Sequence, residues 1–246
     1  MEFVRNIRFW HSRRMAQDSS VTEALPLTEQ AYLALRRALI RGDFEPGQRL
    51  RVDELQRRLG LSSSPLREAL SRLVQQGLVR ALEHRGFRVA PINADAVRDL
   101  TRVRLLVETE TLRDAIAHGD DRWEGRVVAA HHSLALVEKR LPEGPVALDD
   151  DWSERHRALH MSIYSGCTSP LLLGLVENLF DQAERFRRFS ARHRQTDRHK
   201  NDEHQRIVDA VLGRKTDVAT ELLRRHIMGT ERSVLEGLQA MEEAPA

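Results

Sequence analysis

The chain has 246 residues, enough for two modest domains, and 41% of them are hydrophobic, so a buried core is possible. Charged residues make up 31% and aromatic residues 5%, a balance typical of packed amphipathic helices and not of a β-sandwich. The formal net charge is +2, so any binding to nucleic acid would depend on local clusters of arginine and not on an overall basic chain.

Cysteine content and hydropathy indicate in which cellular compartment the protein is expected. A single cysteine, Cys167, excludes an internal disulfide framework and fits a reducing cytoplasm. No apolar run approaches the roughly 20 residues that cross a bilayer, and the opening segment lacks the apolar stretch of a signal peptide. We therefore expect a cytoplasmic protein with no membrane partner, and a poorly ordered extension over residues 1–24.

The first regular elements are two helices separated by a turn. TEQAYLALRRALIRGD has apolar residues at helical spacing, with Thr28 as its expected N-cap and Gly42 at its end. EPGQRL then reads as a turn with a short extended piece. RVDELQRRLG is a second, short helix that Gly60 closes.

A third helix and a hairpin complete this pattern. In SSSPLREALSRLVQQG, Ser64 is the expected cap, Pro65 lies where a missing N–H costs nothing, and three leucines share one face. LVRALEHRGFRVAP contains two extended runs around a tight turn, which predicts a β-hairpin. The order of these elements predicts a winged helix-turn-helix over residues 25–92.

The second half has helical patterns and no strand signal. They cover residues 95–118, 121–140, 149–165, 170–192, 199–212 and 217–238. Short connections join most of them, as in helix bundles. The fold is therefore predicted to be mainly α, with an all-α bundle of six or seven helices over residues 95–240.

Candidate DNA contacts gather at the third helix, because a helix-turn-helix places its second helix in the major groove. Ser62 and Ser63 at its start suit phosphate or base contact. Arg67, opposite the leucines, is placed to donate two hydrogen bonds to guanine, and Arg72 is placed for phosphate. Arg85 and Gly86 at the hairpin tip suit a wing that reaches the minor groove. An isolated exposed arginine is usually only solvated, but the ordered set favours DNA binding.

This N-terminal region resembles GntR-type bacterial transcription regulators. The resemblance covers about residues 27–91 and is carried by GDFEPGQRL, by LSSSPLREALSRLVQQGLV and by the glycine-tipped hairpin. The family's serine, proline and REAL segment match at Ser62, Pro65 and residues 67–70. One departure is Ser63, where the family usually has arginine, and it implies a changed base or phosphate contact.

Four histidines form a candidate metal site. His156 and His160 are four residues apart, so a helix presents them on one face. Two imidazoles rarely suffice for a metal, but His204 and His226 lie on apolar-leaning faces of later helices. The four could meet in the bundle centre, or each could be an ordinary histidine with its own partners; spacing alone leaves both readings open.

Residues 95–238 resemble the all-α FCD ligand-binding domain of the FadR branch of GntR regulators. The matching segments are RVRLLVE, LHMSIYSGCTSPLL, EHQRIVDAVLGRKTDVA and LLRRHI. The resemblance implies a divalent metal held by one carboxylate and three histidines, which fall on His160, His204 and His226, with a small organic acid bound beside it. The carboxylate position falls on His156, and a fourth imidazole favours zinc or nickel over calcium or magnesium.

Three further residues are candidates for effector binding. The resemblance places an arginine at Arg104 to meet the effector carboxylate, which a planar bidentate donor does well. A salt bridge to Glu108, four residues later, is the competing interpretation. Asn178 and Arg188, on the helix after the SGCTSP turn, are the other candidates to line the pocket.

These features predict a ligand-responsive regulator. We expect a homodimer that binds a palindromic double-stranded DNA operator, and a repressor that a small (di)carboxylic acid releases. A DNA-binding protein with a purely structural metal is the alternative. A metal-dependent enzyme is disfavoured, because no general base is assigned near the histidines and the winged helix would be unexplained.

Overall fold

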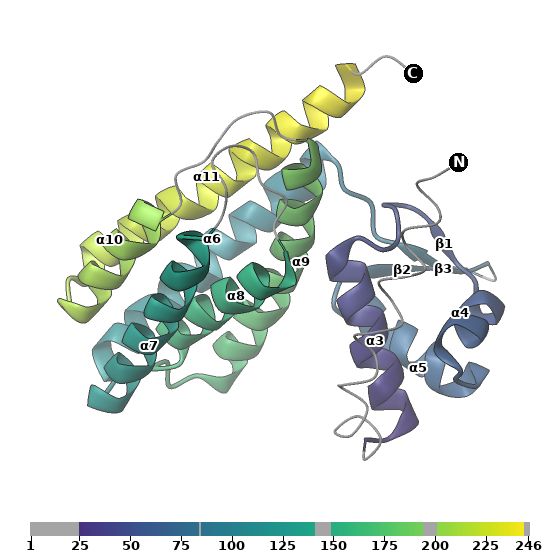
Figure 1. Ribbon diagram of the computed structural model, residues 1–246, viewed down its shortest axis with the longest axis horizontal. Coiled ribbons are helices and arrows are strands. Elements are labelled where there is room, and N and C mark those ends of the chain that lie inside the picture. Colours follow the sequence, from purple (N-terminus) through teal and green to yellow (C-terminus); the bar gives the residue numbers. More distant parts are fainter. Residues whose placement is uncertain (1–24, 84, 141–148, 194–200, 244–246) are drawn as a thin grey trace. The chain divides into compact units, whose positions relative to one another are not determined.

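The computed structural model describes residues 25–83, 85–140, 149–193 and 201–243. The expected disorder of residues 1–24 lies outside this part of the chain. Two compact units divide the protein: residues up to 39 together with 48–90 form the first, and residues 40–47 together with those from 91 onward form the second. Figure 1 shows the first unit in purple and blue, with its small sheet, and the second as a bundle of long helices.

The first unit is a winged helix-turn-helix. Its elements are α3 (Leu27–Arg41), β1 (Arg49–Leu50), α4 (Val52–Leu59), α5 (Ser63–Gln75), β2 (Val79–Leu82) and β3 (Gly86–Val89). The strands form one antiparallel sheet in the order β1-β3-β2, in which the β2–β3 hairpin is the wing. Its core contains the three leucines predicted to share a face of α5, namely Leu66, Leu70 and Leu73, all fully buried.

The helix ends of this unit differ in part from the sequence prediction. Gly60 ends α4 in the left-handed conformation at φ +67°, as expected for a C-cap glycine. Thr28 was wrongly assigned as an N-cap: it lies inside α3, and its hydroxyl donates to Glu68. Ser64 was also wrong, because the N-cap of α5 is Ser62. Runs of serine offer several caps, and packing, not propensity, selects one.

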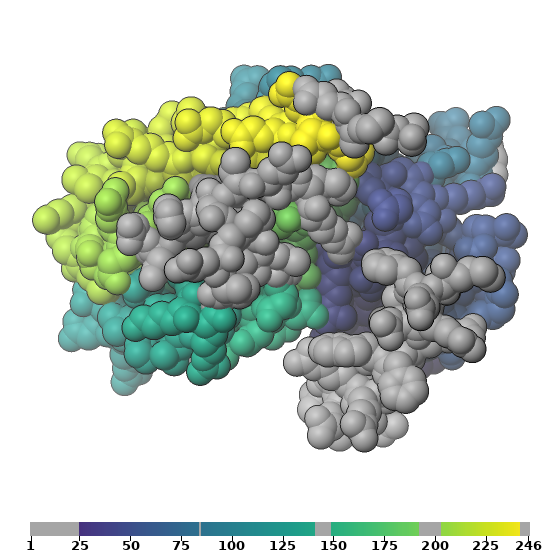
Figure 2. All heavy atoms as spheres, turned by 45° about the horizontal axis from the view of Figure 1, so that its top comes forward, coloured from purple at the N-terminus to yellow at the C-terminus, as the bar shows by residue number. Residues whose placement is uncertain are grey.

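The second unit is an all-α bundle. Its helices are α6 (Ala94–His118), α7 (Asp121–Glu138), α8 (Asp150–Tyr164), α9 (Pro170–His193), α10 (Asn201–Leu212) and α11 (Thr216–Glu243). The long α11 packs along α6 and α9, while α7 packs on α8 and α10. In the space-filling view, α10 and α11 form one side of the bundle surface, in yellow-green and yellow, and α7 and α8 lie opposite in teal (Figure 2).

Side-chain caps and two apolar clusters explain these helices. Asn93, Asp120 and Asp149 each accept a hydrogen bond from a backbone N–H in the first turn of α6, α7 and α8. The main core joins all six helices of the unit around Trp123 and Trp152, and a second cluster joins α6, α9 and α11 around Phe186. The mainly α fold predicted from the sequence is confirmed. Among the described residues, no helix has the length and apolarity needed to span a membrane.

Arg214 ties the start of α11 to the end of α6. Its guanidinium donates to the carbonyl oxygens of Ile116 (2.6 Å) and Gly119 (2.8 Å) and to the carboxylate of Glu124 (2.6 Å). It also lies 5.0 Å from the ring centre of Trp123. We expect Arg214→Ala to lower the free energy of unfolding by about 1–2 kcal/mol, because two helix-terminal carbonyl groups lose their donors. Urea unfolding measures this loss.

A glycine variant at the same position is the matched control. The backbone of Arg214 has φ +53°, a conformation that favours glycine. Arg214→Gly loses the same side-chain contacts but relieves this strain, so it should be less destabilising than Arg214→Ala. Equal stability of the wild type and the alanine variant would show that the contacts contribute nothing.

Candidate metal centre and nucleic-acid interface

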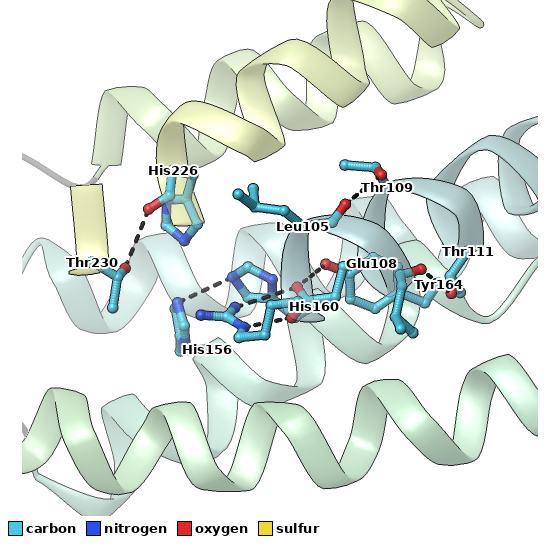
Figure 3. Close-up of polar contacts among 11 residues, drawn as sticks. Leu105, Glu108, Thr109, Thr111, His156, His160, Tyr164, His226 and Thr230 are labelled. Carbon is cyan, nitrogen blue, oxygen red and sulfur yellow. Dashed lines mark hydrogen bonds and ion pairs between the residues drawn. The ribbon is translucent and has the colours of Figure 1, made fainter. Parts of the chain in front are cut away.

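Three helices bring the four predicted histidines together. His156 and His160 extend from α8, His204 from α10 and His226 from α11. One ligand atom from each residue lies within 4.8 Å of the others, and Nε2 of His156 is 3.1 Å from Nε2 of His160. Figure 3 shows His226 pointing from α11 toward His156 and His160, which lie side by side on α8.

Burial favours the neutral form of the two imidazoles on α8. All four residues are at most 5% exposed. Desolvation lowers the pKa of His156 well below its usual 6.5, and the positive charge of Arg187 lowers it further. The pKa of His160 is also well below 6.5, chiefly through burial and then through its neighbours His226 and His204. Neutral imidazole is the form that binds a metal.

The geometry fits a transition-metal ion. Four nitrogen atoms around tetrahedral zinc at ~2.0–2.1 Å are about 3.4 Å apart, so ligand atoms within 4.8 Å need to move by little more than an ångström. Nδ1 of His156 and Nδ1 of His160 are buried, and neither has a hydrogen-bond partner in the part of the chain that the structure describes. A metal held by the Nε2 atoms would fix the proton of each ring on Nδ1, so these two atoms would still need an acceptor.

A buried polar network lies beside His160. Arg104 donates to both carboxylate oxygens of Glu108 at 2.5 and 3.3 Å, and the Tyr164 hydroxyl donates to Glu108 at 2.7 Å. Figure 3 shows Glu108 and Tyr164 beyond His160 on the side away from His156. Burial would lower the pKa of Arg104, but the attraction of Glu108 outweighs it and the pKa is raised. The salt bridge, one of the two interpretations of Arg104, is therefore present, and the residue also lies close to the histidines.

The other two effector candidates make contacts of their own. Arg188 is ion-paired with Glu184 and with Asp150, each at 3.0 Å. The partly buried side chain of Asn178 accepts a hydrogen bond from Gln182 at 3.5 Å. Neither contact places these side chains among the histidines, so their role in effector binding stays a prediction.

The start of α5 forms the candidate DNA surface in the first unit. Ser62, Ser63 and Arg67 are all exposed there, and the Ser62 side chain makes no capping hydrogen bond to the helix. The first backbone N–H groups of a helix attract phosphate, and exposed hydroxyls beside them add donors. This arrangement suits insertion into a groove of DNA.

Arg72 and the wing tip differ in how they are held. Arg72 donates to Glu29 at 2.6 Å and lies 3.9 Å from the ring centre of Tyr32, so it joins α5 to α3. The predicted phosphate contact of Arg72 would have to share the guanidinium with Glu29. Arg85 and Gly86 are exposed, and Gly86 has φ +86°, which explains why glycine stands at this turn.

Models of two protein families match the chain. The model described as bacterial regulatory proteins, gntR family, matches residues 27–89, and the FCD domain model matches residues 99–229. The chain belongs to the GntR family, with an FCD domain as its second unit. As a GntR-family member, it is a DNA-binding transcription regulator, so the expectation that it is not an enzyme is confirmed.

Similar proteins span nearly the same length as this GntR-family protein. The HTH-type transcriptional regulator BphR of Paraburkholderia xenovorans is 36% identical over 90% of this chain and 94% of that protein. The HTH-type transcriptional repressor GlaR of Escherichia coli is 38% identical over 80% of this chain and 90% of that protein. Among solved structures, E. coli McbR/YncC has a TM-score of 0.73 at 19% identity and covers 87% of this chain and 99% of its own, which shows the shared fold.

Sequence reasoning missed Arg187, which lies against the histidine cluster of this GntR-family protein. Its guanidinium is 5.4 Å from the ring of Trp152 and 5.5 Å from that of Phe180, and it pairs with Glu184. Both rings also contact His156. The signal was available, because Arg187 follows Phe180 by seven residues and so shares its helix face.

A row of arginines across the wing of the family's DNA-binding unit was also missed. Arg49, Arg88 and Arg80 are cross-strand partners in β1, β3 and β2, and all three are exposed. Like charges directly opposite each other repel, unless an anion lies between them. The alternation of the hairpin sequence could have shown that Arg80 and Arg88 share one face.

Acid should destabilise the metal-free protein. The pKa values of His156 and His160 are lowered in the fold, so below about 6.5 the unfolded chain takes up protons that the folded chain cannot. Stability is therefore complete above pH 6.5 and falls as the pH drops below it. In the presence of a chelator, the Tm of the wild type should fall more steeply from pH 7.5 to 5.5 than that of a His156→Gln/His160→Gln variant. Parallel curves would contradict this assignment.

Proposed function

We propose that this chain is a homodimeric, cytoplasmic repressor that responds to a small (di)carboxylic acid bound beside a divalent metal. The observation that carries the proposal is the set of four buried histidines whose ligand atoms lie within 4.8 Å of one another. Zinc suits this donor set best, and nickel is the next choice, because imidazole nitrogen is a borderline ligand.

Operator recognition would use α5 and the wing. Ser62, Ser63 and Arg67 would contact the major groove, and Arg85 with Gly86 would reach the minor groove. Arg72 would add a phosphate contact. A dimer would present two such units to the halves of a palindrome. The E. coli relative GlaR is named a transcriptional repressor, and we extend this role to the present chain.

Exposed apolar side chains support the homodimer. Val103 and Leu106 on α6 are 38% and 68% exposed, and Leu171 and Leu175 on α9 are 74% and 41% exposed. Their spacing of three and four residues puts each pair on one side of its helix, and α6 packs on α9. A second copy would remove these side chains from water, and sedimentation equilibrium measures whether it does.

The effector would bind between the metal and buried positive charge. Arg104 lies close enough to His160 to lower its pKa, and Arg188 and Asn178 are the remaining predicted contacts. A carboxylate that ligates the metal and accepts hydrogen bonds from Arg104 would compete with Glu108 for the guanidinium. Effector binding would thus rearrange the network that joins α6 to α8, which provides a link from the ligand to the helices.

A structural metal without an effector is the second candidate. Four imidazoles fill the four positions of tetrahedral zinc, as in closed structural sites. An effector that binds the metal directly would need zinc to accept a fifth ligand, or a six-coordinate ion such as nickel. A site with only three protein ligands would leave a position open for an effector. The four-histidine set does not, which favours a purely structural metal.

Footprinting with metal-loaded protein separates the two candidates. The regulator should protect a palindrome, and one acid from a panel of mono- and dicarboxylic acids should abolish the protection. The same acid should have no effect on chelator-treated protein. Protection that no acid alters, combined with a Tm that no acid raises, would favour the structural metal.

A further inference from the structure

The carboxylates of two glutamates lie beside the Nδ1 atoms of two of the four histidines. Oε1 of Glu138, at the end of α7, is 3.6 Å from Nδ1 of His204. Oε2 of Glu203, in the first turn of α10, is 3.0 Å from Nδ1 of His226. A carboxylate accepts and does not donate, so it favours the tautomer with the proton on Nδ1 and leaves Nε2 with a lone pair. These two rings thus turn Nε2 toward the cluster.

The remaining two histidines lack such partners. Nδ1 of His156 and Nδ1 of His160 are buried and make no hydrogen bond to any described residue. The His156 ring is held instead by stacking on Trp152, with ring centres 4.5 Å apart. The cluster therefore contains two imidazoles with a carboxylate beside Nδ1, on α10 and α11, and two on α8 whose Nδ1 atoms have no such carboxylate among the described residues.

The two glutamates would compensate the charge of a bound divalent ion. Four neutral imidazoles bring no negative charge to a dication, and a buried dication without compensation is costly. The nearby cations Arg104 and Arg187 are already paired with Glu108 and Glu184. Glu138 and Glu203 together carry two negative charges, which match the charge of one divalent ion.

The carboxylate of Glu138 should interact more strongly with the site than that of Glu203, because it is more buried. Its side chain is 9% exposed, and that of Glu203 is 40% exposed. Among the described residues, Oε1 of Glu138 is buried without a hydrogen bond at the present distance. Its charge also acts on His131. Burial lowers the pKa of His131, and the attraction of Glu138 offsets part of that shift. A shift of less than one ångström would give Glu138 a hydrogen bond to His204.

We propose that Glu138 and Glu203 are the positioning residues of the metal centre, which orient His204 and His226 and neutralise the bound dication. This inference rests on the metal centre proposed above. It makes α7 part of the site although it contributes no ligand. Metal capture would then draw α7 toward α10 through Glu138 and His204.

Zinc affinity of glutamine variants tests the proposal. In competition with a chromophoric chelator, Glu138→Gln should weaken zinc binding about 10- to 100-fold, the range typical of lost outer-shell partners. Glu203→Gln should weaken it less, because water screens its more exposed carboxylate. Glu154→Gln is the matched control: this exposed glutamate lies two residues before His156 and should leave affinity unchanged.

A double-mutant cycle separates positioning from a general loss of stability. In a His204→Ala background, Glu138→Gln should have no further effect on zinc affinity, because the ring that it orients is gone. Nitrogen-15 NMR of the zinc-loaded wild type should show His204 and His226 protonated at Nδ1. The chelator-treated Glu138→Gln variant should unfold at or near the Tm of the wild type.

The outcomes distinguish this proposal from the metal centre itself. Wild-type protein that binds zinc, with glutamine variants that bind it equally well, overturns the role of the glutamates and leaves the four-histidine site standing. Wild-type protein that binds neither zinc nor nickel overturns both. An undiminished effect of Glu138→Gln in the His204→Ala background would also overturn the positioning role.

Discussion

Zinc binding by a His160→Ala variant is expected to fall by more than the roughly 10- to 100-fold that the loss of an outer-shell partner costs, since one of the four ligands is removed. His160 contacts the other three histidines: its Nε2 lies 3.1 Å from Nε2 of His156, and its ring centre is 5.7 Å from that of His204 and 5.3 Å from that of His226. Elemental analysis and chelator competition measure the loss. The response to any effector should disappear with the metal.

Two controls make this result specific. His132→Ala removes an exposed histidine from α7 and should change nothing. His160→Gln keeps more of the side-chain volume, so it separates the loss of a ligand from the cavity that alanine leaves. Operator binding should stay measurable in both His160 variants, because the DNA surface shares no residue with the site. Unchanged metal content in His160→Ala would refute the metal centre.

The fold was predictable because its signals are local. Each helix of the bundle has apolar residues at helical spacing, and glycine or proline marks many of the ends, as Gly60 and Pro170 do. Errors arose where several residues could perform one task. Ser62, Ser63 and Ser64 all suit an N-cap, and only tertiary packing decides that the helix begins after Ser62. Thr28 was wrong because the helix already begins at Leu27.

The metal centre was only partly predictable. The i,i+4 spacing of His156 and His160 indicates a shared face, but nothing in the spacing places His204 and His226 opposite them; the family resemblance supplied that. The partners behind the rings were missed because they come from distant positions. Glu138 is 66 residues before His204 in the chain, and Glu203 contacts His226, which lies 23 residues later on another helix. Such pairs depend on how helices pack.

Arg67→Ala is expected to weaken specific operator binding by about 1–3 kcal/mol and to relax sequence preference at one base pair. Arg67 is exposed on α5, one turn after Ser63, whereas Leu66 and Leu70 are fully buried. An arginine there can donate two hydrogen bonds to guanine, which no phosphate contact replaces. Fluorescence anisotropy on the operator and on operators with single base changes measures both effects.

The comparison with nonspecific DNA decides what Arg67 contacts. A base contact predicts a loss on the operator and little change on random sequence, whereas a phosphate contact predicts an equal loss on both and a shallower salt dependence. Arg225→Ala is the matched control, because it removes an exposed arginine from α11, 73% exposed, outside the DNA-binding unit. An equal loss on random DNA would reassign Arg67 to the phosphate backbone. Sequence readout would then rest on Ser62, Ser63 and the wing, and Ser63, where the family usually has arginine, would become the next residue to exchange.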